Sequence, residues 1–347
     1  LLGAGITLCG LYFEADEKET RDEAMDFAIE TGAWFANELD RAILPLFSFA
    51  QFATELPIFA DLPNKIGEAY EPGSLPFLTN EDGSFNPNRN VTGVCDQPEL
   101  VSRFTQIASA IKMNAGMEGV LHNLQLAPEG VICLLNPMNN TEDFDDGRFL
   151  DSSSAWGLDL LNAPFTKYIA TSGLAKEEIG IAGPRPLSQC PTCGLYFIAR
   201  LPIRTDKHQI TVNGKAYNRW GFATALINWE ALIERSEIHD RLDVNDHFQK
   251  KGLEFQLTRT DRIYNDETET YVEDVVVLAE SKSFGSKNHD VSTALQTTNN
   301  EWVMTVQFDD GLRWEGLFVA VAVLVAFCIA TLVYVILIQK QSHTTML

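Results

Sequence analysis

The longest apolar run in the chain lies near its C-terminus, where residues Leu317 to Leu337 contain no charged side chain. At about 1.5 Å of rise per residue, a helix of this length spans roughly 30 Å, which matches the hydrocarbon core of a bilayer. The pattern predicts a transmembrane helix within residues 315–338, with residues 339–347 beginning a cytoplasmic segment. Residues 1–13 are equally apolar but too short to span. We interpret them as the end of a first membrane helix, with the tail of a signal peptide as the alternative.

A long stretch of helical periodicity follows the first apolar segment. Apolar residues recur at helical spacing from Asp16 to about Phe59, interrupted by Pro45 and ended by Pro57. This pattern predicts one long, kinked stalk helix within residues 14–63 that rises from the membrane.

The rest of the block between the membrane segments reads as a linker and two groups of strands. Residues 64–127 combine a loop rich in Gly, Pro, Asn and Asp with a second helix, which Asp96 can cap and which should run to about Leu126. Short apolar runs bounded by turn residues then predict strands within 128–240 and again within 241–314. The predicted fold class is α+β, a stalk helix followed by two antiparallel-sheet subdomains in tandem.

Charge indicates on which side of the membrane this block lies. The segment before the C-terminal helix carries Asp309, Asp310 and Glu315 against Arg313, whereas Lys340 follows the helix. The N-terminal apolar segment is likewise followed by mainly acidic residues. Because basic residues stay on the cytoplasmic side, we expect the block to be extracellular, on a plasma-membrane protein. The formal net charge of -22 argues against nucleic acid as a partner.

Candidate modification sites suit an exterior domain. Asn90 and Asn139 each begin a glycosylation sequon. Four cysteines lie between the apolar segments, Cys95, Cys133, Cys190 and Cys193. They permit two disulfides with three connectivities, among which the sequence alone does not choose. Because Cys190-Pro191-Thr192-Cys193 is followed by strand-like sequence, we predict a structural disulfide that pins a hairpin turn rather than a redox site.

No motif in the chain indicates an enzyme. The sequence lacks a nucleophile elbow and a phosphate-binding loop, and zinc would need a second cysteine pair at comparable spacing. The acidic, His-containing segment from His239 to His247 is interpreted as a solvated helix end. We therefore expect no catalytic residues, no cofactor and no metal in this part of the protein.

A series of short motifs carries a resemblance to a known family. After the long membrane-rooted helix, the motifs follow in the order Pro128-Glu129-Gly130-Val131-Ile132, Trp156-Gly157-Leu158-Asp159-Leu160, Gly183-Pro184-Arg185-Pro186-Leu187, Leu201-Pro202-Ile203 and Trp220-Gly221-Phe222. This order resembles the CHASE family, extracellular sensor domains of receptor histidine kinases and nucleotide cyclases that are flanked by two membrane helices. The resemblance covers roughly residues 95–240 by motif. It implies two PAS-like sheets, with a small ligand held in the membrane-distal one.

The resemblance also implies ligand-binding residues. Asp159 matches a carboxylate that hydrogen-bonds the ligand in plant cytokinin receptors, although it can equally serve as a turn or cap residue before Ala163. Looser correspondences place Leu187, Ser188 and Arg200 against the pocket. Arg200 is a departure from the plant receptors, and a guanidinium in the pocket would favour a carboxylate or phosphate ligand. It can alternatively pair with Asp159 or point to solvent.

Two classes of function remain. The first is a ligand-sensing module of a transmembrane receptor whose cyclase or kinase part lies outside this chain. The second is a non-catalytic adhesion or scaffold ectodomain. Because the apolar stripe of the stalk is wider than one face of a small sheet would cover, we also expect a parallel homodimer through residues 20–56.

Overall fold

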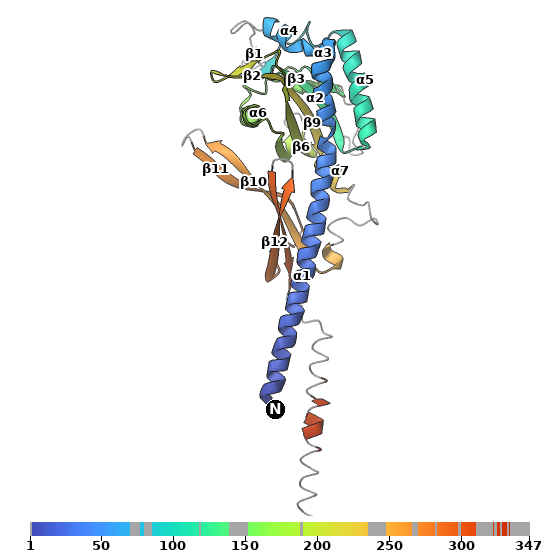
Figure 1. Cartoon of the computed structure of the whole chain (residues 1–347), viewed down its shortest axis with the longest axis vertical. Helices are drawn as coiled ribbons and strands as arrows, with labels where there is room; N and C mark the ends of the chain where they lie inside the picture. The colour runs from blue at the N-terminus through green and yellow to red at the C-terminus, as the bar shows by residue number, and fades with distance from the viewer. Residues whose placement is uncertain are drawn as a thin grey trace, which may run out of the picture.

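Figure 1 shows the computed structural model of the chain. It describes residues 2–69, 77–79, 85–117, 119–138, 152–187, 190–234, 248–265, 270–281, 283–297, 300–309 and isolated residues between 322 and 333, with residues 2–17 as backbone only. The fold is mixed α+β, as predicted, with a long N-terminal helix and antiparallel sheets.

The predicted kinked stalk consists of four helices in succession, α1 (Leu2–Ile43), α2 (Pro45–Glu55), α3 (Pro57–Ala60) and α4 (Leu62–Ala69). Pro45 and Pro57 each occupy the first turn of a new helix, where the absent N–H would have no partner in any case. α1 begins upstream of the predicted start at Asp16, and α4 extends past the predicted end at residue 63. Two short strands, β1 (Phe77–Thr79) and β2 (Phe85–Arg89), pair within the region expected to be loop.

The second helix is shorter than predicted. α5 (Pro98–Ala115) ends at Gly116, whose φ of 58° is the left-handed conformation typical of a helix C-terminus. The chain then forms β3 (Leu121–Pro128), so the prediction of helix up to Leu126 is wrong. Every residue of β3 is buried. A strand that is buried on both faces lacks the alternation of apolar and polar residues by which a strand is recognised in a sequence.

Five antiparallel strands form the sheet farthest from the N-terminus (Figure 1). They are β3, β4 (Leu134–Asn136), β5 (Gly180–Leu187), β6 (Cys190–Arg204) and β9 (Arg219–Asn228), in the spatial order β4-β3-β9-β6-β5. One face packs against α2 and α5, and α6 (Pro164–Lys176) packs on β5 and β6. The remaining small elements are the 3₁₀ turn Ser152–Ala155, the hairpin of β7 (Ile210–Val212) and β8 (Lys215–Tyr217), and α7 (Trp229–Glu234).

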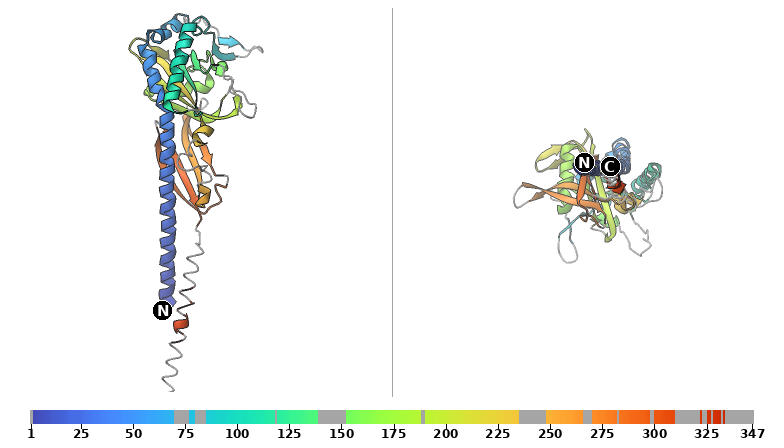
Figure 2. Two further views of the ribbon diagram at one scale, coloured as in Figure 1. Left: turned by 90° about the vertical axis from the view of Figure 1, so that its right-hand side faces the viewer. Right: turned by 90° about the horizontal axis from the view of Figure 1, so that it is seen from below.

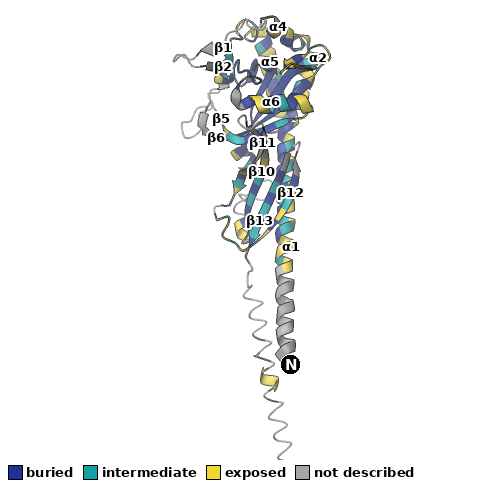
Figure 3. Cartoon of the chain, turned by 90° about the vertical axis from the view of Figure 1, so that its left-hand side faces the viewer, coloured by how far each residue is buried: buried dark blue, intermediate teal, exposed yellow. Residues whose placement is uncertain are grey.

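A second antiparallel sheet lies alongside the middle of α1 (Figure 2). Its strands are β10 (Glu254–Asn265), β11 (Thr270–Glu280), β12 (His289–Thr297) and β13 (Asn300–Phe308), in the order β11-β10-β13-β12. The buried positions of α1 begin where the helix meets this sheet (Figure 3). The two come so close that a Cβ on Gly32 would lie 2.2 Å from Cδ2 of Leu295 on β12.

Aromatic side chains join the two sheets and the stalk. Phe197 of β6 stacks on Trp302 of β13, with ring centroids 5.6 Å apart. Phe197 also meets Trp229 edge-on at 5.1 Å, and Trp229 stacks on Phe35 of α1 at 6.0 Å. All four side chains are buried in one continuous hydrophobic core.

For most residues of the two predicted membrane helices, the structure does not describe the side chains. Val325, Ile329 and Val333 are described within the C-terminal apolar run, and they are helical and exposed. Among the described residues, no single helix is long and apolar enough to cross a membrane, whereas a pair bent by 86°, Lys18–Glu55 with Pro57–Gly67, has the required length and composition. Both membrane helices therefore stay predictions.

Candidate ligand-binding site

A row of side chains crosses the five-stranded sheet at its centre. Directly opposed residues on neighbouring antiparallel strands point to the same face. The register therefore places on one face, in order, Leu135, Gln125, Thr224, Arg200 and Gly180. The three polar members, Gln125, Thr224 and Arg200, are all buried. On β9 the row is flanked by the apolar side chains of Leu226 and Phe222.

Helix α6 covers the β5–β6 end of this row. A Cβ on Gly180 would lie only 2.9 Å from Cγ2 of Ile169, so the helix passes close above the strand at this point. Because Gly180 is opposite Arg200, the guanidinium lies on the sheet face that α6 covers. The glycine thus allows the helix to close over the polar row.

Arg200 is the charged residue of the row, and it is buried. Arg200 is only 4% exposed, and its Nε and Nη1 atoms have no hydrogen-bond partner among the described residues. Burial, and to a lesser extent the like charge of Arg185, lowers the pKa of Arg200 to about 9. Arg185 is half-buried, and burial also lowers its pKa.

This arrangement can bind an anion. A buried charge without a partner costs several kcal/mol in rough terms, and such a cost is normally offset by an opposite charge. A guanidinium presents five N–H donors in a planar fork that fits a carboxylate or phosphate. The neighbouring Thr224 hydroxyl, which is also buried and without a hydrogen-bond partner among the described residues, can add a further contact.

Asp159 is engaged by the chain itself. Its Oδ1 accepts hydrogen bonds from the backbone N–H groups of Leu161 and Asn162, at 3.0 and 3.1 Å. Its Oδ2 accepts from Asn162 Nδ2 at 2.8 Å and from Arg89 Nε at 2.7 Å. The geometry is therefore that of a turn residue before α6. A ligand would have to displace one of these donors, and the ligand role of Asp159 stays a prediction.

The expected ion pair between Arg200 and Asp159 does not form. The cationic partner of Asp159 is Arg89, at 2.7 Å, because Asp159 lies beside β2 and the turn after β3, whereas Arg200 lies in the middle of β6. The alternative that Arg200 points to solvent is also wrong, since the residue is buried. Arg89 is the last residue of β2 and is distant in sequence from both Asp159 and Arg200. No local sequence pattern marks it as the partner of Asp159.

The other implied site residues are described unevenly. Leu187 is buried at the end of β5 and belongs to a small cluster with Ile198, two residues before Arg200 on β6. Ser188 lies outside the described residues. The strand expected after the motif is confirmed, but it begins at Cys190, so Cys190 and Cys193 lie on β6 itself rather than in a turn before it; their side chains are outside the described part of the chain.

One disulfide is present among the described residues. It joins Cys95 and Cys133, across 38 positions, and so ties the start of α5 to the segment before β4. Of the three possible connectivities of the four cysteines between the apolar segments, this bond leaves only the one that pairs Cys190 with Cys193. That second disulfide stays a prediction.

Of the two predicted glycosylation positions, Asn90 is exposed, and its side-chain oxygen accepts from the backbone N–H of Thr92 at 3.1 Å. Asn139 and the segment from His239 to His247 lie outside the described residues. Within the described part of the chain, no group of three or more His, Cys, Asp or Glu residues is placed to hold a metal ion.

Comparison with known proteins gives little guidance. No family model matches the chain, and no curated protein matches it. Among solved structures, it is similar to one described as "Methyl-accepting Chemotaxis protein X", at 11% identity and a TM-score of 0.33, over 86% of this chain and 97% of that chain. A likeness this low does not establish a shared fold, so the functional argument rests on the residues of this chain.

Proposed function

We propose that this chain is the extracellular small-ligand-sensing module of a transmembrane signalling receptor, and that its ligand carries a carboxylate or phosphate group. The observation that supports this proposal is the buried guanidinium of Arg200, which has no partner at Nε or Nη1 among the described residues. The chain has a net charge of -22, so many carboxylates are available to pair with a buried cation. None of those described is hydrogen-bonded to Nε or Nη1 of Arg200. Departures of this kind from stable packing are typical of functional sites.

The packing offers a route by which an occupied site would act on the stalk. Arg200 lies on β6 three residues from Phe197, whose ring packs on Trp229 and Trp302. Trp229 in turn stacks on Phe35 of α1. A ligand that binds one arrangement of these rings more tightly than another would shift the population of stalk positions. The cyclase or kinase expected from the CHASE resemblance would then respond outside this chain.

We also propose that the stalk pairs with a second copy, through a different stripe from the one first expected. Much of the apolar stripe packs within the chain, as the buried residues Leu39, Ile43, Leu46, Phe49 and Ala53 show. On the outward side, Ile29, Leu44 and Phe47 are 48%, 59% and 52% exposed. Three large apolar side chains along one helical face favour a parallel homodimer.

The ligand proposal is tested by thermal melting of the purified 347-residue chain with acetate, succinate or inorganic phosphate, each against acetamide at the same ionic strength. We expect at least one anion to raise the midpoint, because a ligand that binds only the folded state stabilises it. In Arg200→Met the anion effect should disappear. In Arg103→Met, which removes an exposed arginine of α5, it should persist.

Two results would overturn the proposal. The first is an anion effect of equal size in Arg200→Met and in the wild type. The second is a wild-type midpoint that no member of an extended panel of carboxylates and phosphates raises above the neutral controls.

A further inference from the structure

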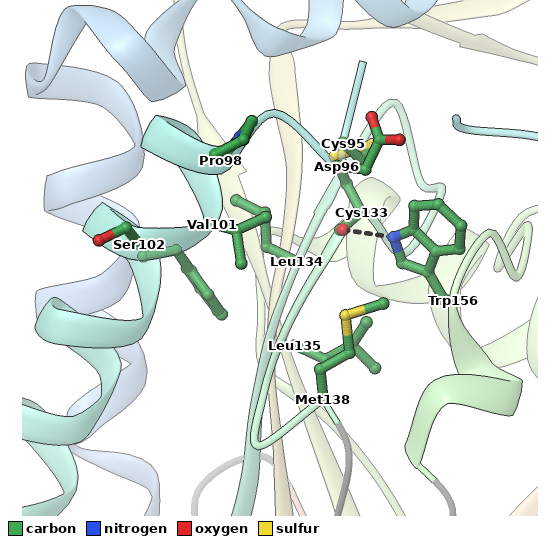
Figure 4. Close-up of a pocket in the computed structure, with 11 residues that line it drawn as sticks. Cys95, Asp96, Pro98, Val101, Ser102, Cys133, Leu134, Leu135, Met138 and Trp156 are labelled. Carbon is green, nitrogen blue, oxygen red and sulfur yellow. Dashed lines mark hydrogen bonds between the residues drawn. A yellow bond between two sulfur atoms is a disulfide. The ribbon is translucent and has the colours of Figure 1, made fainter. Parts of the chain in front are cut away.

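A separate cavity lies at the opposite edge of the five-stranded sheet, between the start of α5 and β4 (Figure 4). Its volume is about 380 Å³, which lies within the range of small-molecule sites. The Cys95–Cys133 disulfide forms part of its wall. Leu135, the apolar end of the row described above, lines this cavity, but Arg200 is three strands away in the order β4-β3-β9-β6, so the cavity does not include the guanidinium.

The floor of the cavity is apolar and rigid. Phe104, Leu134 and Leu135 line it and are buried, and the half-buried Met138 adds a polarisable thioether. The disulfide holds the segment before β4 against α5, which fixes the distance between the two walls. Such a floor accepts the hydrocarbon or aromatic body of a ligand but offers no partner to a polar group.

The mouth of the cavity carries the opposite chemistry. Asp96 is exposed there, and among the described residues its Oδ1 alone is engaged, by the backbone N–H of Gly93 at 2.7 Å. Trp156 lies beside it, with its indole fixed by a hydrogen bond from Nε1 to the carbonyl oxygen of Cys133 at 2.9 Å (Figure 4). A carboxylate next to a fixed indole attracts a cation by charge and by the π-face of the ring.

We propose that this cavity binds a small organic cation, an ammonium group carried on a compact apolar or aromatic body. The ammonium would lie at the mouth between Asp96 and the indole of Trp156, and the body would fill the apolar floor. The strong negative charge of the chain raises the local concentration of such cations. The two sites therefore select ligands of opposite charge.

The test uses calorimetric titration of the purified 347-residue chain with 2-phenylethylammonium, 2-phenylethanol and phenylacetate, which share a ring and differ in charge. We expect the ammonium compound to bind about tenfold more tightly than the alcohol, in line with a charge-assisted contact, and phenylacetate to bind least. Asp96→Asn should abolish this preference, because the amide oxygen can still accept from Gly93 but the charge is gone. Glu99→Gln, which removes an exposed carboxylate in the first turn of α5 that does not line the cavity, should leave it unchanged.

Filling the cavity supplies the second variant. Val101→Trp places a large ring in the cavity from the side of α5 and should abolish binding of all three probes while the thermal midpoint shows that the chain is folded. Equal affinity of the ammonium compound and the alcohol, or an unchanged preference in Asp96→Asn, would overturn the assignment of a cation. Absence of binding by every probe, or binding that persists in Val101→Trp, would overturn the cavity as a site.

Discussion

Replacing Arg200 by Met should make the ligand-free protein more stable. Methionine keeps a long flexible side chain in the space under α6 but removes the buried charge. The lowering of the pKa of Arg200 to about 9 corresponds to roughly 5 kcal/mol of unfavourable free energy for the charged form in the folded state. Relaxation around the site lowers the realised gain, and replacement of buried charges by apolar side chains commonly yields about 1–4 kcal/mol. For a chain of this size, the melting midpoint should rise by about 1–6 °C.

The pH dependence of this gain follows from the direction of the pKa shift. Below about pH 9 the guanidinium is charged in both the folded and the unfolded state, so the full penalty is present and constant. Above that value the folded state loses the proton first, which relieves the penalty as the pH rises towards the unfolded pKa. The stability difference between Arg200→Met and the wild type should therefore be constant from pH 6 to 8 and shrink towards pH 10.

Denaturant unfolding at several pH values, without added carboxylate or phosphate, measures this difference. Arg103→Met serves as the control, because an exposed arginine should contribute less than about 0.5 kcal/mol. A lower stability of Arg200→Met at pH 7 would mean that the guanidinium has a partner in the folded protein and would refute the reasoning.

Three further predictions concern the framework. Gly32→Ala should destabilise the chain by about 1–3 kcal/mol, because the added Cβ would press α1 away from β12, and an unchanged urea midpoint would contradict this close packing. Replacing Cys95 and Cys133 together by Ala should lower the free energy of unfolding by about 2–5 kcal/mol, as measured by thermal or denaturant unfolding. A variant as stable as the wild type would show that the disulfide does not stabilise the fold. On a non-reducing gel, Leu44→Cys should cross-link two copies and Glu38→Cys should not, since Glu38 is 4% exposed; the reverse result would exclude the proposed dimer face.

Local signals account for the parts of the fold that the sequence predicted. The prolines at 45 and 57 set the breaks in the stalk, because proline cannot continue the hydrogen-bond ladder of a preceding helix. β3 was missed because both of its faces are buried. β12 does not stand out within the predicted strand region 241–314, because its sequence, HDVSTALQT, has few large apolar residues to form a pattern.

The candidate site could be predicted from the sequence only in part. Arg200 could be placed on a strand from the apolar run around it, but its missing partner could not be predicted, because a partner depends on which segments meet across the fold. Asp159 illustrates the same point, since Arg89 reaches it from 70 positions away in sequence. Pairing across such distances leaves no trace in local spacing.

The aromatic contacts between Phe197, Trp229 and Trp302 also bear on how the protein can be dissected. A fragment ending near residue 240 would contain the whole five-stranded sheet, yet it would lose the ring of Trp302 and expose the faces of Phe197 and Trp229 to water. The sequence boundary between the two sheets is therefore a poor site for truncation or for domain grafting. A chimaera that transfers this part of the chain to another protein should exchange both sheets and the stalk as one cassette.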